Sequence, residues 1–298
     1  MTSPEFAGNR DNYCYRHPDR QSFVLCQRCM RTICPECQTQ AAVGVICPEC
    51  MKEQQQNRTP AQKRAQRQWS RRSAGAVAIA GRGGKPVVTY ALLAITTFIG
   101  LVQLIPGIGD QITNALLFAG PYLYPDLFPL PFQPWRLLTA VFVHGGFIHL
   151  ALNMLALWML GQGLEPMLGR ARFLALYLIS GFGGSVMVAV LAPTTATVGA
   201  SGAIFGLMAA LLIIGRHIGA NVVGILIVLG VNFAVGFVFG GIAWQAHLGG
   251  AIVGALVALI YMRTRRREQR TWQILLLVAL VVLLIVVVAF VSPLILLA

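Results

Sequence analysis

Residues 198–214 read VGASGAIFGLMAALLII, an uncharged apolar run that contains one serine, Ser201. Comparable runs recur from Val87 to the end of the chain. Over the whole chain, 56% of the residues are hydrophobic and only 11% are charged. The mean hydropathy is +0.69. Because lipid offers no hydrogen-bonding partners, backbone groups inside a membrane are satisfied within helices. The sequence therefore predicts an all-α protein that crosses a membrane several times.

Seven apolar runs each approach the roughly 20 residues that a helix needs to cross about 30 Å of hydrocarbon. We therefore expect seven membrane spans, over Val87–Ile105, Phe147–Leu164, Phe173–Ala192, Val198–Ile214, Ile218–Phe239, Ile242–Met262 and Ile274–Ala298. The connection between the first two spans, Pro106–Pro134, holds six prolines and few charges. We expect this loop to be ordered by its prolines and partly apolar, and not to form a helix.

The first 85 residues hold 14 of the 23 Lys and Arg, all seven Cys and no apolar run long enough for a signal peptide. This predicts a cytoplasmic amino terminus. Basic residues then follow spans two, four and six, whereas Arg136 is the single Lys or Arg near the opposite connections. The positive-inside rule predicts a multi-pass protein of the cell membrane with its carboxyl terminus outside. A net charge of +13 concentrated beside the spans favours anionic lipid headgroups, and not nucleic acid, as the partner.

Three polar side chains interrupt the apolar spans at a similar depth. His149, Ser201 and His247 lie within about the first two turns of spans two, four and six, which are all expected to run inward from the outer face. Ionisable groups in lipid are costly, so this set predicts a functional site. Spans four and six also carry GxxxG pairs, which let membrane helices approach closely; the pairs are Gly202 with Gly206 and Gly250 with Gly254.

These residue types are those of acyl-transfer chemistry. A serine hydroxyl becomes nucleophilic when a base removes its proton, and His247 suits that role for Ser201. His149 and Asn153, four residues apart on one helix face, can hold an oxyanion together with the Ser201 N–H. No Asp or Glu lies at this depth, so we expect a dyad and not a triad. Taken singly, each His or Asn could instead be an interhelical hydrogen-bonding residue.

Several motifs, in their order along the chain, resemble those of the rhomboid family of intramembrane serine proteases. They cover about Val87–Met262 and are Trp135-Arg136, His144, His149-Leu150-Ala151-Leu152-Asn153, Gly199-Ala200-Ser201-Gly202, and Ala246-His247 with Gly250 and Gly254. The resemblance implies that Ser201 is the nucleophile and His247 the general base, with His149, Asn153 and the Ser201 N–H as oxyanion hole. It also implies supporting roles for Gly199, Gly202, Gly250, Gly254, Phe205, Trp135, Arg136 and His144.

The resemblance further implies a six-helix core followed by one added carboxy-terminal helix, with single-span membrane proteins as substrates. Phe205 stands where bacterial members often have tyrosine, and its ring can still stack on His247 without the hydroxyl. The gate for substrates would involve span five and its outer loop, Gly240–Trp244. Glu165, at the end of span two, could brace loops by this resemblance, although a solvated helix end is the simpler interpretation.

Four ligand pairs use every cysteine of the amino-terminal region: Cys14 with His17, Cys26 with Cys29, Cys34 with Cys37, and Cys47 with Cys50. This spacing predicts two closed tetrahedral zinc sites, which a segment of about 37 residues needs in place of a large core. A disulfide framework is the alternative, but a cytoplasmic segment is kept reduced and seven is an odd number. The order looks like a B-box-type zinc finger, in which pairs one and three share one metal and pairs two and four the other. Sequential pairing is the alternative.

A closed zinc site has no open position for catalysis, so we expect this module to bind a cytoplasmic protein partner or to regulate the protease. The zinc is then structural, and no cofactor serves catalysis. The expected parts are a zinc module at 1–50, a basic flexible linker at 51–85, the six-helix core at 86–263, and a basic loop with the seventh helix at 264–298. The main prediction is an intramembrane serine protease that cuts membrane-embedded proteins. The alternative is an inactive rhomboid-like adaptor that binds membrane clients and recruits partners through the zinc module.

Overall fold

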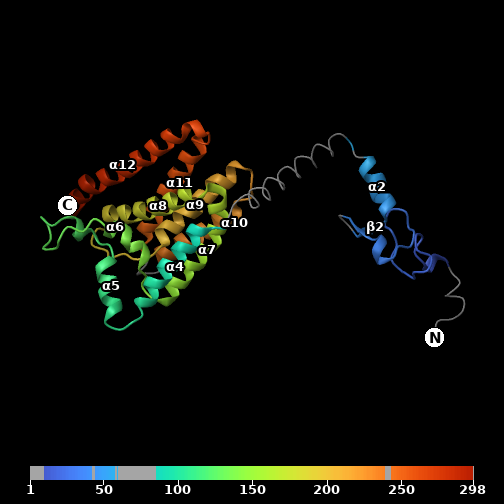
Figure 1. The fold of residues 1–298 in the computed structure, drawn as a ribbon, viewed down its shortest axis with the longest axis horizontal. Helices are drawn as coiled ribbons and strands as arrows, with labels where there is room; N and C mark the ends of the chain where they lie inside the picture. Colours follow the sequence, from blue (N-terminus) through green and yellow to red (C-terminus); the bar gives the residue numbers. More distant parts are fainter. Residues whose placement is uncertain (1–9, 42–43, 58, 60–84, 239–242, 298) are drawn as a thin grey trace. The chain divides into compact units, whose positions relative to one another are not determined.

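The computed structural model describes residues 10–41, 44–57, 59, 85–238 and 243–297 (Figure 1). The chain divides into two compact units, Met1–Val77 and Ala78–Ala298. The first unit holds the cysteines and the second holds the apolar helices. Most of the expected linker and most of the expected gate loop Gly240–Trp244 lie outside the described residues.

The cysteine-rich unit has little regular structure and a core made of its own cysteines. Its elements are the 3-10 helices η1 (Arg10–Asn12) and η2 (Pro35–Cys37), the antiparallel strands β1 (Thr39–Gln40) and β2 (Val45–Ile46), and helix α2 (Pro48–Gln56). Six of the seven cysteines are buried, together with Ile33 and Ile46. Because so short a segment buries little apolar surface, the clustered cysteines replace a conventional core.

Helix α2 extends the module past its expected end at residue 50. The helix starts with proline at its first position and with the Cys47 sulfur, which accepts a hydrogen bond from the Cys50 N–H at 3.4 Å. Two ion pairs fasten α2 to the preceding loop: Arg31–Glu49 at 2.8 Å and Arg28–Glu53 at 3.5 Å. Residues 51–56 are therefore helical, and the expectation of a flexible linker is wrong for them.

The helices of the membrane unit follow the seven predicted apolar runs. They are α4 (Val87–Val102), α7 (Phe147–Leu168), α8 (Arg170–Leu191), α9 (Ser201–His217), α10 (Val223–Val238), α11 (Trp244–Arg263) and α12 (Arg270–Leu297). Among the described residues, α7, α8, α11 and α12 are long and apolar enough to cross a membrane, whereas α4, α9 and α10 are apolar but shorter. The chain is thus a mostly helical multi-span membrane protein, and the number of seven spans stays a prediction.

Glycines allow α8, α9 and α11 to pack backbone against backbone. A Cβ on Gly254 of α11 would overlap the backbone of Gly206 on α9, and a Cβ on Gly250 would overlap Gly202. Since the earlier glycines meet each other and the later glycines meet each other, α9 and α11 run parallel and begin at the same end. Gly184 of α8 lies against both helices. The GxxxG pairs therefore act as close-packing positions, as the sequence predicts.

The connection Pro106–Pro134 contains a helix, α5 (Ile108–Leu116), so the expectation of a loop without helix is wrong. Five of its six prolines lie beyond residue 120, and residues 107–116 contain none. Gly107, with a φ of +80°, starts the turn into α5. Apolar residues at 108, 112, 115 and 116 give α5 one apolar face. The 3-10 helix η3 (Gly120–Leu123) and coil follow, before the short helices α6 (Arg136–Thr139) and η4 (Ala140–Phe142).

A buried carboxylate joins the end of α7 to the start of α4. Glu165 is only 2% exposed, and it accepts hydrogen bonds from the Val88 N–H (2.9 Å), the Thr89 N–H (2.7 Å) and the Thr89 hydroxyl (2.7 Å). It caps α4, where free N–H groups and the helix dipole favour an anion. The interpretation of Glu165 as a solvated helix end is therefore wrong, and its bonds agree with the bracing role that the resemblance implies.

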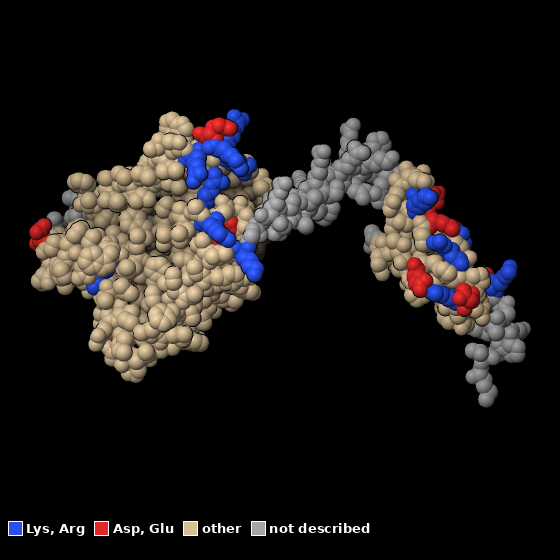
Figure 2. Space-filling model, viewed as in Figure 1, with Lys and Arg blue, Asp and Glu red and all other residues tan. Residues whose placement is uncertain are grey.

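Hydrogen bonds at two positions fasten α12 to the rest of the unit. Near its start, Gln273 donates to the carbonyl and hydroxyl of Thr264 and accepts from Arg172 at 2.8 Å. Farther along, the Tyr124 hydroxyl donates to the Val288 carbonyl at 2.7 Å. Lys and Arg of this unit gather where α11 and α12 meet, and much of the visible face is uncharged (Figure 2). The orientation of this end in a membrane stays a prediction.

Candidate functional site

Ser201 is the first residue of α9 and follows a tightly held turn. Gly199 has a φ of +120°, and its N–H donates to the Ala140 carbonyl at 2.8 Å. A Cβ at Gly199 would lie 2.9 Å from Nε2 of His149, so glycine is required here. The Ser201 N–H lies in the first turn of the helix, where N–H groups lack intrahelical partners. The positive end of the helix dipole therefore faces the space around Ser201.

His247 lies in the first turn of α11 and is buried, with 7% of its surface exposed. The Phe205 ring on α9 stacks on the imidazole, with ring centroids 4.1 Å apart and planes 8° from parallel. Ser201 and His247 thus begin two helices that are in backbone contact. Among the described residues, no hydrogen bond joins the Ser201 hydroxyl to His247, and Nδ1 of His247 has no partner. Burial and stacking hold this imidazole in place.

His149, on α7, is the third of the polar residues predicted to lie at a similar depth. Its ring lies against Gly199. Its Nδ1 accepts the Gly145 N–H at 3.4 Å, so the proton of the neutral ring resides on Nε2, beside the Ser201 turn. Asn153 is buried and donates from its amide to the His149 carbonyl at 2.8 Å. One amide N–H remains for another acceptor. The structure thus brings His149 to the Ser201 turn and places Asn153 one helical turn further along α7.

His144 also contacts the turn that precedes Ser201. Its Nε2 accepts the Ala200 N–H at 3.3 Å, and its ring meets the His149 ring edge to face, with centroids 5.1 Å apart. Gln103, the residue after α4, bonds to both backbone polar groups of His144. Gln103 is not among the site residues predicted from the sequence, because a single glutamine after an apolar run has no distinctive pattern.

Arg136 and Trp135 have different environments in the connection between α4 and α7. Arg136 is buried, and one guanidinium nitrogen donates to the carbonyls of Asn114 (2.7 Å) and Leu117 (2.8 Å) at the end of α5. The guanidinium also lies 3.8 Å from the ring centroid of Tyr122. Trp135, in contrast, is 53% exposed. Arg136 therefore orders the connection, whereas Trp135 faces outward, as an aromatic anchor at a membrane surface would.

The eight predicted metal ligands form two clusters of four in the cysteine-rich unit. Within each cluster the ligand atoms lie within 4.8 Å of one another: Cys14, His17, Cys34 and Cys37 in one, and Cys26, Cys29, Cys47 and Cys50 in the other. The interleaved grouping predicted from the sequence is confirmed, and sequential pairing is wrong. All seven cysteines are free thiols, which excludes the disulfide alternative in this structure. Each cluster could hold one metal ion.

The thiols within each cluster differ in how readily they ionise. Burial disfavours the Cys14 thiolate, but hydrogen bonds from backbone N–H groups outweigh burial and lower its pKa to about 6. Burial and hydrogen bonds to neighbouring thiols raise the pKa of Cys37, in the same cluster, to about 11. In the second cluster the same causes lower the pKa of Cys26 to about 6 and raise that of Cys50 to about 12. Such crowded thiols can all ionise only when a cation compensates their charge.

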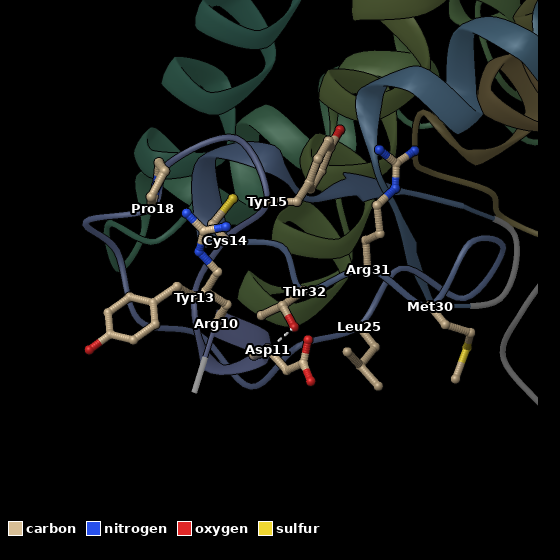
Figure 3. Close-up of a pocket in the computed structure, with 10 residues that line it drawn as sticks. All are labelled: Arg10, Asp11, Tyr13, Cys14, Tyr15, Pro18, Leu25, Met30, Arg31 and Thr32. Atoms are coloured by element: carbon tan, nitrogen blue, oxygen red, sulfur yellow. Dashed lines mark hydrogen bonds between the residues drawn. The ribbon is translucent and has the colours of Figure 1, made fainter. Parts of the chain in front are cut away.

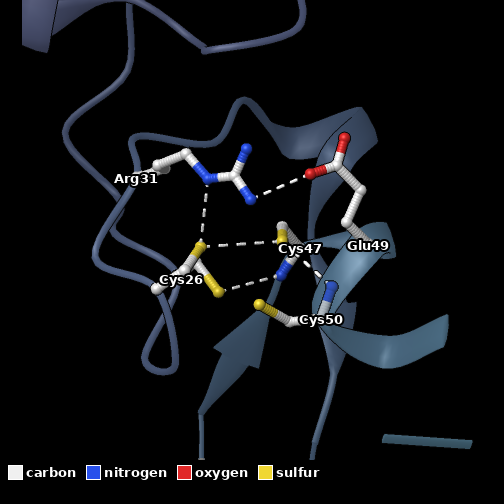
Figure 4. Close-up of polar contacts among 6 residues, drawn as sticks. Cys26, Arg31, Cys47, Glu49 and Cys50 are labelled. Atoms are coloured by element: carbon white, nitrogen blue, oxygen red, sulfur yellow. Dashed lines mark hydrogen bonds and ion pairs between the residues drawn. The ribbon is translucent and has the colours of Figure 1, made fainter. Parts of the chain in front are cut away.

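Arg31 lies beside the all-cysteine cluster (Figure 4). Its Nε donates to the Cys29 sulfur at 3.4 Å, and its guanidinium pairs with Glu49 at 2.8 Å. The guanidinium also lies 4.3 Å from the ring centroid of Tyr15. This hydrogen bond orients the Cys29 sulfur and would offset part of its charge if the cluster held a metal ion.

A hollow on the surface of the module is lined by rings, apolar side chains and arginines (Figure 3). Its lining residues include Arg10, Tyr13, Tyr15, Leu25, Met30 and Arg31. Met30 is 65% exposed and Leu25 is 44% exposed. Aromatic residues, Met and Arg are enriched in protein interfaces, so the hollow has the composition of a protein-binding surface.

Comparison with known proteins gives the family of the membrane unit. Residues 131–264 match the family model described as Rhomboid domain. Rhomboid protease GluP of Bacillus subtilis (strain 168) is 37% identical over 185 residues, which are 59% of this chain and 35% of that protein. RHOMBOID-like protein 4 of Arabidopsis thaliana is 39% identical over 137 residues, which are 44% of this chain and 34% of that protein.

A shorter relative is covered more completely. Putative rhomboid protease YdcA of Bacillus subtilis (strain 168) is 37% identical over 144 residues, which are 45% of this chain but 70% of that protein. In contrast, the chain spans only about a third of GluP and of the Arabidopsis relative. The matched segment 131–264 includes Arg136, His149, Ser201 and His247. Because residues 131–264 match the family model and the matched part of the chain covers 70% of YdcA at 37% identity, the chain belongs to the rhomboid family.

Proposed function

We propose that this chain is an intramembrane serine protease in which Ser201 and His247 form the catalytic dyad. The observation that carries this proposal is the pairing of α9 and α11: both helices begin at the same end, and Phe205 of the first stacks on His247 of the second. Catalytic hydrogen bonds are often long before substrate binds, so a dyad is compatible with the unlinked Ser201 hydroxyl. Membership of the rhomboid family supports the same assignment.

In the proposed reaction, His247 accepts the Ser201 proton as the serine oxygen attacks the carbonyl carbon of the scissile peptide bond. The Ser201 N–H, Nε2–H of His149 and the Asn153 amide donate hydrogen bonds to the resulting oxyanion. The imidazolium of His247 then protonates the leaving amine as the C–N bond breaks, which leaves an acyl-serine. Water, deprotonated by the same imidazole, hydrolyses the ester and restores Ser201.

The substrates in this proposal are single-span membrane proteins that are cut at the depth of Ser201. Membership of the rhomboid family supports membrane proteins as substrates, and GluP and YdcA are named as proteases of this family. The charge pattern supports a cell-membrane location with the amino terminus in the cytoplasm and the carboxyl terminus outside. In this orientation, Ser201 and His247 lie near the outer face.

The test is cleavage of a single-span substrate by the purified protein in a lipid bilayer. Wild-type protein is compared with Ser201→Ala and His247→Ala. We expect product from the wild type alone, since the residual catalysis of a serine protease without its nucleophile or base is several orders of magnitude lower. Equal product from all three proteins would exclude the dyad.

We further propose that the amino-terminal module holds two structural zinc ions. In tetrahedral zinc, bonds of about 2.3 Å to sulfur and about 2.1 Å to nitrogen separate two sulfurs by about 3.8 Å and nitrogen from sulfur by about 3.6 Å. The sulfurs of Cys29 and Cys47 are 3.8 Å apart, and Nδ1 of His17 lies 3.3 to 3.8 Å from the three sulfurs of its cluster. With four protein ligands, each zinc would stabilise the fold. The interleaved ligand order supports a B-box-type module.

The second candidate function is an adaptor that binds membrane clients and recruits a cytoplasmic protein through the module. The hollow beside Arg31 favours this candidate as an addition to protease activity, because its exposed apolar side chains suit a protein partner. Activity that depends on Ser201 would exclude the purely adaptor role. Client binding by an inactive wild-type protein would favour it.

A further inference from the structure

We propose that Gln103 is a positioning residue that holds the Ser201 turn in its reactive geometry by fixing His144. This inference rests on the proposed protease function. Gln103 directly follows α4, whereas His144 precedes α7 and Ser201 begins α9. Hydrogen bonds between side chains and backbone groups connect these three segments, which are remote in sequence.

The Gln103 side chain binds both polar groups of the His144 backbone. Its Oε1 accepts the His144 N–H at 3.0 Å, and its Nε2 donates to the His144 carbonyl at 3.1 Å. The same Nε2 donates to the Thr113 hydroxyl at 2.7 Å, and that hydroxyl donates to the Gly109 carbonyl at 2.9 Å. A residue bonded at both of its backbone groups cannot turn without breaking a bond. Gln103 therefore fixes the direction in which the His144 side chain leaves the chain.

The His144 ring connects the position fixed by Gln103 to the Ser201 turn. The residue is 5% exposed, and its Nε2 accepts the Ala200 N–H at 3.3 Å. Since Nε2 is the acceptor, the neutral ring carries its proton on Nδ1, which has no partner among the described residues. The bond from the Ala200 N–H therefore links the His144 ring directly to the turn before Ser201. Ala200 precedes Ser201, so this bond and the bond from Gly199 to Ala140 hold the turn from two sides.

Loss of the Gln103 bonds would release His144 and allow the Ala200 N–H to tilt. Both the Ser201 hydroxyl and the Ser201 N–H follow Ala200, so the attacking atom and an oxyanion donor would move together. A displacement of about 1 Å at a reacting group costs on the order of 100-fold in rate. The effect falls on kcat and leaves KM little changed, because Gln103 acts on the turn that carries the chemistry and not on substrate binding.

The variant that tests this proposal is Gln103→Met, which keeps the length of the side chain and removes its hydrogen bonds. Full-length protein in lipid bilayers is labelled with a fluorophosphonate, a probe that reacts with activated serines, and its cleavage kinetics and thermal unfolding are measured. Thr113→Val is the local control, because Gln103 keeps both bonds to His144. Gln273→Met is the stability control, since Gln273 is a buried glutamine that also makes three hydrogen bonds, at the start of α12.

We expect Gln103→Met to lower the labelling rate and kcat by roughly tenfold or more and to change KM by less than about twofold. Both controls should label at about the wild-type rate, and Gln273→Met should lower the unfolding temperature at least as much as Gln103→Met. Labelling of Gln103→Met at the wild-type rate would overturn the inference, as would an equal loss in Gln273→Met, because the loss would then follow stability. Wild-type protein that neither labels nor cleaves would overturn the proposed function, and this inference with it.

Discussion

The Phe205 ring lies parallel to the imidazole of His247, with 8° between the ring planes and 4.1 Å between the centroids. Phe205 and Ser201 are four residues apart on α9, so one helix face carries the proposed nucleophile and the ring that holds its base. Nδ1 of His247 has no partner among the described residues. The stack therefore sets the plane of this imidazole, a task that a carboxylate performs in a triad.

Phe205→Ala is expected to lower kcat on the order of tenfold, because an aromatic pair contributes about 0.5–1.5 kcal/mol beyond its buried area. Cleavage of a single-span substrate in bilayers measures the effect. Phe205→Tyr is the matched control, since its ring can keep the stack, and it should retain most of the activity. Equal activity of the alanine and tyrosine variants would show that the stack does not position His247.

Gly254→Ala is expected to destabilise the membrane unit by about 1–3 kcal/mol, because overpacking forces helices apart. The added methyl group would overlap the backbone of Gly206 on α9. Thermal unfolding in detergent micelles measures the loss. Gly163→Ala on α7 is the control, because a Cβ there meets no atom within 4 Å. That variant should be neutral or more stable by about 0.5–1 kcal/mol, as expected for Gly→Ala in a helix. A similar loss in both variants would contradict glycine-dependent packing.

Glu165→Ala should destabilise the unit by about 1–3 kcal/mol, because it leaves the partly buried Val88 N–H and the buried Thr89 N–H without their acceptor. The measurement is again the unfolding temperature in micelles. Glu165→Gln should lose less, since its amide oxygen still accepts a hydrogen bond, although the favourable charge at the start of α4 is gone. If both variants unfold at the wild-type temperature, the carboxylate does not cap α4.

The helices could be predicted from the sequence because a membrane leaves the backbone few alternatives. Uncharged runs become helices, and small residues such as Gly206 and Gly254 mark where two helices meet. The shared direction of spans two, four and six predicts that His149, Ser201 and His247 lie at a similar depth. The two Cys/His clusters could be predicted for a similar reason, since a closed tetrahedral metal site demands four ligands of a few residue types.

The remaining features depend on contacts between residues that are remote in sequence. Gln103 and Glu165 bond to backbone groups, which every residue has, so no residue pattern identifies their partners. Helix α5 departs from the expectation for another reason. The prolines of its loop are unevenly spaced, and the stretch 107–116 has none and carries a helical apolar period. Whether a loop contains a helix therefore depends more on the spacing of its prolines than on their number.

Double substitutions in the zinc module test the two clusters against sequential pairing. Cys14→Ser with Cys34→Ser removes two ligands from one cluster and leaves the other intact, so metal analysis should give about one zinc per chain. Cys14→Ser with Cys26→Ser damages both clusters and should give close to none, whereas the wild type should give about two.

Sequential pairing would reverse the two results, because Cys14 and Cys26 would then share a metal. In each variant the membrane unit should keep its unfolding temperature, since the cysteine-rich unit and the helical unit are separate compact units. A strong chelator should likewise unfold the module of the wild type and leave the membrane helices folded, because zinc-binding energy in such a small module is folding energy. Wild-type protein that is purified under reducing conditions without chelator and contains no zinc would exclude the metal sites.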